Sequence, residues 1–307
     1  MTSALFVSSM QLGLLYAIMA MGVYITFRIL NIPDLTVDGS FTLGMSCGAV
    51  VTISGHPYLA LLAAVLVGAV AGSITGLLQT KIGIHPILSG ILVMTGLYTV
   101  NMAVMGGKAN LSAAGKETLF TKMEALIVTS FGLGKTLLAL LMAVIVVIIL
   151  SVFFKTKTGL AIRATGDNED MVRSSSINAN MTKCFGLAIG NGCVALSGAL
   201  LSQHQMFSDV NFGIGMVIIG LASVIIGETI IGRHSVTIGL ISAVVGSVIY
   251  RIIIAIALKY NFFPSYALKL VSALIVVLAL SIPQIVAGVK QNKVRKEATY
   301  AGTKKCE

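Results

Sequence analysis

Charged side chains that could contact a partner concentrate in one stretch, Thr158 to Asn178, which reads TGLAIRATGDNEDMVRSSSIN. It holds five charged residues in a chain that is 56% hydrophobic and only 10% charged. Small and apolar residues alternate with these charges, as they do on a surface that docks onto another protein. A solvated connector with incidental charges is the alternative interpretation.

The same stretch has the features of two short helices, 158–164 and 168–176. Asp167 or Asn168 can cap the second helix, because both side chains accept hydrogen bonds from free backbone N–H groups. Its acidic residues come first and Arg173 comes near its end, an order that suits the helix dipole. A compact, structured loop is therefore expected here.

Three further ionisable residues fall in apolar segments, where an unpaired charge costs several kcal/mol. They are Asp38, Glu228 and Arg251. Glu228 and Arg251 fall near opposite ends of their segments, so they are not expected to pair with each other. Arg251 could extend to the membrane surface or have a functional role, and Glu228 could have a structural partner or lie near a gate.

The stretch NIPDLTVDGSFTLG predicts a break in the helix near membrane depth. Pro33 has no amide hydrogen and disfavours helix just before it, and Asp38 can cap the helix that follows. Irregular backbone at such depth lines a cavity or is buried in protein. Asn191, between two glycines, could hold helices together or line the same path.

No set of side chains suggests catalysis or a metal site. Gly134, Lys135 and Thr136 imitate the end of a phosphate-binding loop, but Thr129 stands where the first glycine is required. The four histidines and four cysteines show no ligand spacing for zinc. The chain is therefore expected to bind no metal or nucleotide and to catalyse no reaction.

The elements that position these residues are apolar helices. Mean hydropathy is +0.97, and several uncharged runs reach the roughly 20 residues that cross a hydrocarbon core. The fold class is therefore all-α, a polytopic transmembrane bundle of about nine spans, with eight to ten open. The expected spans are 6–27, 38–54, 57–79, 86–106, 136–154, 184–206, 214–232, 236–258 and 267–289.

Lysine and arginine indicate the orientation. If loop 155–183 is cytoplasmic, fourteen basic residues fall inside and six outside, which favours the N-terminus out and the C-terminus in. Residues 1–289 then form the membrane domain, with loop 107–135 outside and a basic cytoplasmic tail, 290–307, near anionic lipid. The net charge of +10 thus indicates topology and not nucleic-acid binding.

Glycines at four-residue spacing predict close helix packing. They occur at Gly68, Gly72 and Gly76, and again in the pairs 44/48 and 186/190.

The central loop resembles the permease subunits of bacterial ABC importers of the branched-chain amino acid and ribose type, which carry T-G-x-A-x-R-A-x-G-x-N. Ser176 departs from the usual glycine that follows. The segments NIPDLTVDGSFTLG and GETIIG are similar to those of a subgroup assigned to aromatic amino acid uptake, of tryptophan or tyrosine. The matching residues are Thr158, Gly159, Ala161, Arg163, Ala164, Gly166 and Asn168.

The resemblance implies a transport subunit of the bacterial cytoplasmic membrane that pairs with a second copy of itself. Two ATP-binding cassette subunits would bind ATP and magnesium, and an extracytoplasmic substrate-binding lipoprotein would deliver a small solute. An ion-coupled secondary transporter is the alternative, although no inverted repeat is evident. The residues expected to couple to the ATPase are Gly159, Ala161, Arg163, Ala164, Asn168, Glu169, Asp170 and Arg173. Candidates for the translocation path or gate are Asp38, Ser40, Phe41, Asn191, Glu228 and Arg251.

Overall fold

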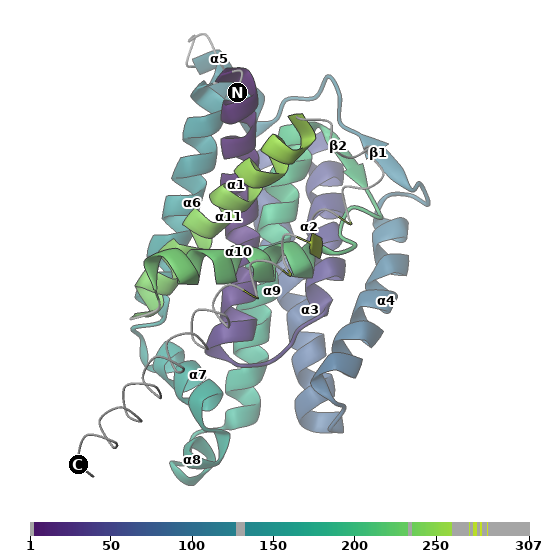
Figure 1. The fold of residues 1–307 in the computed structure, drawn as a ribbon. Coiled ribbons are helices and arrows are strands. Elements are labelled where there is room, and N and C mark those ends of the chain that lie inside the picture. The colour runs from purple at the N-terminus through teal and green to yellow at the C-terminus, as the bar shows by residue number, and fades with distance from the viewer. Residues whose placement is uncertain are drawn as a thin grey trace, which may run out of the picture.

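The computed structural model describes residues 3–126, 133–232 and 235–259, with a few positions between 270 and 281. The described chain is mostly helical, and eight of its helices coincide with eight expected spans. Figure 1 shows most of the long helices running side by side as a bundle. The ninth expected span, 267–289, and the tail, 290–307, lie almost wholly outside the described residues.

Six helical segments of the described chain are long and apolar enough to cross a membrane. Two of them end in a π-helical turn, η1 or η2. The six are α1 (Ser3–Tyr24) with η1 (Ile25–Ile29), α3 (Pro57–Leu77) with η2 (Leu78–Ile82), α4 (Pro86–Val104), α6 (Leu133–Phe153), α9 (Ala179–Gln205) and α11 (Val236–Lys259).

Two other helices, α2 (Thr36–Ile53) and α10 (Met216–Ile231), were expected as spans but are not among these six. Both begin inside the bundle, and α10 runs across it (Figure 1). The 16 residues of α10 are fewer than a hydrocarbon core requires. The structure therefore does not confirm a count of about nine spans.

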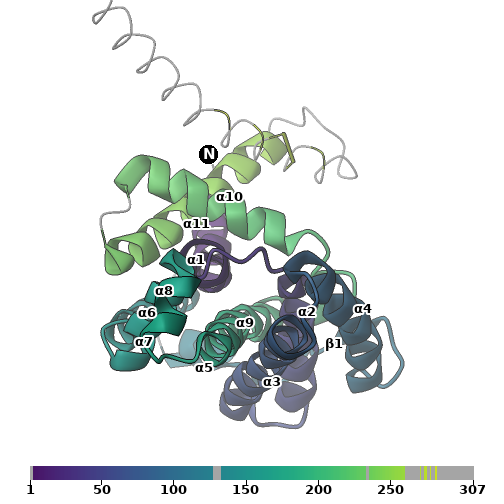
Figure 2. The ribbon, with the colours of Figure 1, turned by 90° about the horizontal axis from the view of Figure 1, so that it is seen from below.

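The core is built around α1 and α9. Seen from below, α2, α3 and α4 lie on one side of this pair and α10 and α11 on the other (Figure 2). Helix α9 packs along α2 and α3 through glycines: a Cβ on Gly44 would lie 2.5 Å from the Cα of Ala195, and one on Gly76 would lie 2.8 Å from the Cα of Cys184. The glycine spacing thus corresponds to close backbone contact between helices.

The two ends of the bundle carry different elements. Helices α7 (Lys157–Asp167) and α8 (Glu169–Ser174) lie at one end, and α5 (Leu119–Leu126) lies at the other. At the same end as α5, β1 (Asn110–Ser112) pairs antiparallel with β2 (Phe207–Asp209), with Leu111 opposite Ser208. This short two-stranded sheet ties loop 107–135 to the end of α9, and the described chain otherwise agrees with the all-α expectation.

Candidate functional site

The loop between α6 and α9 folds into two capped helices. The Asn168 carboxamide oxygen accepts the Met171 N–H at 3.1 Å and so begins α8. Thr156, just after α6, accepts the Gly159 N–H at 3.3 Å and caps α7. Ser176, which follows α8, has φ +60°, a backbone conformation that favours glycine.

Helix α7 is held firmly against the bundle. Gly166 lies against the backbone of η1, where a Cβ would be 3.0 Å from the Cα of Leu30. Ile162 is buried in the main apolar core, and the Thr165 hydroxyl lies 2.7 Å from that of Thr182 on α9. A force on α7 would therefore be transmitted to both η1 and α9.

Glu169 fastens α8 to the start of α9. Its carboxylate pairs with Lys183 and, at 2.8 Å, with Arg173, which also donates to Asn180 at 2.9 Å. The hydrogen bonds from Lys183 and then Arg173 lower the pKa of Glu169. The pKa of Glu169 is thus lower in the folded protein than in the unfolded chain. The two ion pairs therefore stabilise the loop at neutral pH, and this stabilisation is lost as the pH falls through the folded-state pKa.

The exposed side of the loop differs from the surface expected from the sequence. Gly159 is buried and Ala161 and Ala164 are half-buried, so these residues pack toward the bundle. Val172, another apolar residue of the loop, is also buried. The solvent-facing side instead carries Leu160, Arg163, Asp167, Asn168, Asp170, Met171 and Arg173.

This exposed side combines apolar and charged groups. Leu160 of α7 and Met171 of α8 are 50% and 58% exposed. Arg163 lies one turn from Leu160, and no carboxylate within the described residues pairs with it. The surface therefore presents an unpaired cation beside apolar groups, a combination suited to a protein partner. Leu160 was not predicted to lie on this surface, because the prediction rested on the small residues of the loop.

A buried polar cluster lies where α2 begins. Asp34 accepts the Thr36 N–H at 2.9 Å and the Asn191 amide at 2.7 Å, so it joins the start of α2 to α9. Asn191 also donates to the Leu187 carbonyl at 3.0 Å, and its own oxygen is buried without a hydrogen-bond partner. The sequence indicated that Asn191 could hold helices together but gave no sign that Asp34 is its partner.

Asp38 caps a helix other than its own. It lies in the first turn of α2, and its two oxygens accept the N–H groups of Gly215 and Val217, each at 2.8 Å. These N–H groups belong to the N-terminal end of α10. The expectation that Asp38 caps the helix following Pro33 is thus wrong: the carboxylate joins the beginnings of α2 and α10 inside the bundle.

Aromatic rings stack beside this junction. Phe41 of α2 is fully buried between Tyr16 of α1 and Phe212, with ring centroids 6.1 and 6.4 Å away. The guanidinium carbon of Arg251 on α11 lies over the Tyr16 ring, 4.0 Å from its centroid. Ser40 is buried beside Phe41, and its hydroxyl has no hydrogen-bond partner.

Arg251 faces into the bundle and does not extend to the membrane surface. Its Nε is buried without a hydrogen-bond partner, and the guanidinium rests on Tyr16. No ion pair of Arg251 occurs within the described residues, and the sequence between 260 and 290 contains no acidic residue. Arg251 and Glu228 do not pair, because Glu228 pairs with Arg28.

The Arg28–Glu228 pair joins η1 to the end of α10, with 8% of the Glu228 side chain exposed. Glu228→Gln should lower the free energy of unfolding by about 1–3 kcal/mol, because Arg28 loses its partner in a partly desolvated place. Thermal unfolding of the purified protein measures the loss. The double variant that exchanges the two residues, Arg28→Glu with Glu228→Arg, should recover at least half of the lost stability. If the double variant instead lost as much stability as the two single variants added together, the pairing would be contradicted.

Together, the long apolar helices define a multi-pass helical membrane protein that carries a capped two-helix loop at one end. Residues 5–280 match the model of the family described as the branched-chain amino acid transport system permease component. The chain belongs to this family, whose members are the transmembrane permease subunits of ABC importers.

Several curated relatives cover most of the chain. A tyrosine transport system permease protein of Clostridioides difficile is 40% identical over 276 residues, 90% of each chain. A fructose import permease protein of Bifidobacterium longum is 25% identical over 96% of this chain and 83% of its own. A ribose import permease protein of Escherichia coli is 26% identical over 69% of this chain and 65% of its own. No solved structure matches significantly.

Proposed function

We propose that this chain is the permease of a bacterial importer for an aromatic amino acid, working as two copies in the cytoplasmic membrane. The α7–α8 end faces the cytoplasm and rests on two ATPase subunits, which bind ATP and magnesium. An extracytoplasmic binding lipoprotein delivers the amino acid at the β1–β2 end. The observation that carries the substrate class is the 40% identity, over 90% of both chains, with a tyrosine transport permease.

The contacts support a specific route for the conformational change. ATP binding draws the ATPase subunits together and moves α7, which lies directly against η1. From η1, the pair between Arg28 and Glu228 reaches α10, whose other end is held by Asp38. A shift of α7 would thus change where α2 and α10 meet inside the bundle. A two-state rearrangement of this kind can open the translocation path first to one side of the membrane and then to the other.

An ion-coupled secondary transporter receives less support. It would need acidic groups free to bind a proton or cation at mid-membrane depth. The Asp38 carboxylate is engaged by two backbone N–H groups, Asp34 by Thr36 and Asn191, and Glu228 by Arg28.

Reconstitution tests the function and the substrate separately. In liposomes containing the permease, its ATPase and its binding protein, uptake of labelled tyrosine should require ATP and should persist when ionophores collapse ion gradients. Unlabelled tryptophan or phenylalanine should compete, and leucine or ribose should not. Uptake by the chain alone on an ion gradient would overturn the importer, whereas ATP-driven uptake of only leucine or ribose would overturn the aromatic substrate.

A further inference from the structure

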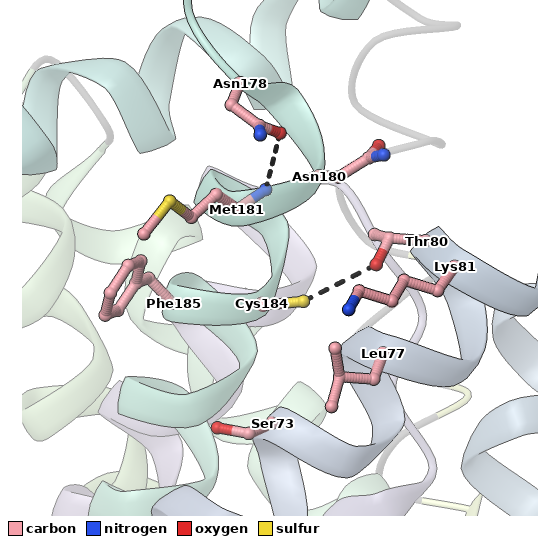
Figure 3. Close-up of a pocket in the computed structure, with 9 residues that line it drawn as sticks. All are labelled: Ser73, Leu77, Thr80, Lys81, Asn178, Asn180, Met181, Cys184 and Phe185. Carbon is pink, nitrogen blue, oxygen red and sulfur yellow. Dashed lines mark hydrogen bonds between the residues drawn. The ribbon is translucent and has the colours of Figure 1, made fainter.

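A pocket of about 410 Å³ opens between α3 and α9 at the α7–α8 end of the bundle (Figure 3). From the pocket toward the middle of the bundle, Gly68, Gly72 and Gly76 hold the two helices in close contact. This close contact between α3 and α9 ends at Cys184, whose Sγ lies 3.6 Å from the Thr80 hydroxyl oxygen. The glycine row ends there, and the larger side chains of η2 and of the first turns of α9 line the space between the helices.

The pocket has an apolar wall and a cationic rim. Leu77, Met181 and Phe185 supply the wall, and each is more than two-fifths exposed. Lys81 supplies the cation, and Figure 3 shows its amine turned toward α9. No acidic residue lines the pocket, and within the described part of the chain no carboxylate pairs with Lys81. The site therefore lacks an anion to match its charge.

The depth of the pocket matches a lipid headgroup. Helix α3 has 21 residues and so rises by roughly 30 Å, the thickness of a hydrocarbon core. Lys81, four residues past its end, falls at the level of phosphates. A row of exposed apolar side chains runs along α3 toward the pocket at intervals of four residues, from Leu62 to Ile74. An acyl chain can lie along this row while the phosphate reaches Lys81.

We propose that this pocket binds an anionic phospholipid from the leaflet on the α7–α8 side, with the headgroup phosphate on Lys81 and an acyl chain against Leu77 and Phe185. Basic pockets between membrane helices on the cytoplasmic side suit such headgroups, and burying acyl methylenes against the wall adds apolar stabilisation.

The lipid would also act on the loop, an effect that rests on the proposed function. Asn180 lines the pocket and accepts a hydrogen bond from Arg173 of α8. Lys183, one turn further along α9, pairs with Glu169. A lipid that bridges η2 to the first turns of α9 therefore fixes the base on which α8 rests, and should raise transport-coupled ATP hydrolysis.

Native mass spectrometry of the full chain in detergent tests the binding without any partner. Phosphatidylglycerol should bind more tightly than phosphatidylcholine, and Lys81→Gln should weaken phosphatidylglycerol binding about five- to tenfold. Lys155→Gln makes the same charge change at the same end but outside the pocket, and should change binding less than twofold. Phe185→Ser should weaken binding of long-chain lipid more than that of a short-chain analogue.

Other occupants give different results. Equal losses in the two lysine variants would show general surface attraction, and competition by millimolar inorganic phosphate would show a free-anion site. A Lys81→Gln variant that loses self-association would show an interface between two copies. Each of these outcomes overturns the lipid site. None of these outcomes overturns the proposed importer function, which is tested separately by uptake measurements. In those measurements, Lys81→Gln should retain ATP-driven uptake, but phosphatidylglycerol should no longer change its rate.

Discussion

Arg163→Glu is expected to lower transport-coupled ATP hydrolysis in the assembled importer about tenfold or more, while the permease folds and inserts as before. Arg163 is exposed beside Leu160, and no carboxylate within the described residues engages it. Reversing its charge would place like charges together in a docked interface, which costs several kcal/mol. Hydrolysis stimulated by the loaded binding protein, and co-purification of the ATPase, are the measurements.

Lys155→Glu is the matched control for this variant. It makes the same charge reversal near α7 on an exposed residue that precedes the helix, so coupling should stay within about twofold of the native value. Glu169→Gln should give an intermediate loss for a different reason, because it releases α8 from Lys183 and Arg173 while leaving Arg163 in place. Unchanged coupling in both Arg163→Glu and Glu169→Gln would refute docking through this loop.

Local features of the sequence were sufficient to predict most helices and the two helices of the loop. Apolar length located eight of the described helices, although only six of them are long and apolar enough to cross a membrane. Cap chemistry located α8, because Asn168, the acidic residues after it and Arg173 interact within a few residues of one another. The glycine rows likewise predicted close packing, since a missing side chain has the same consequence wherever the partner helix lies.

Contacts across the sequence could not be predicted in this way. Asp38 has the position of a cap for α2, yet its partners lie 177 and 179 residues away at the start of α10. Arg28 and Glu228 are 200 residues apart and meet only because α10 turns across the bundle. Likewise, an amphipathic pattern shows that α7 has two faces but not which one meets the bundle, so Gly159 was assigned to docking although it is buried.

The largest effect on folding is expected at the contact of α9 with α2 and α3. Gly44→Leu and Gly72→Leu should each abolish recovery of folded permease, because a Cβ on Gly44 would lie 2.5 Å from the Ala195 backbone and one on Gly72 would lie 2.7 Å from the Leu187 carbonyl carbon. Helix backbones cannot yield at such distances without separating the helices, and the interior is too tightly packed to absorb a leucine. Size-exclusion profiles and thermal unfolding in detergent measure the loss.

Gly96 on α4 is the matched control, since it also lies in a long apolar helix but a Cβ there would meet nothing within 4 Å. Gly96→Leu should give a folded protein of native or slightly higher stability, because leucine favours helix more than glycine does by about 0.8 kcal/mol. Gly44→Ala and Gly72→Ala should already lower the unfolding temperature by several degrees, through the first carbon alone. If leucine were tolerated equally at Gly44, Gly72 and Gly96, α2 and α3 would not pack closely against α9. The proposed route of conformational change from α7 to the junction at Asp38 would then lack the tight helix packing on which it depends.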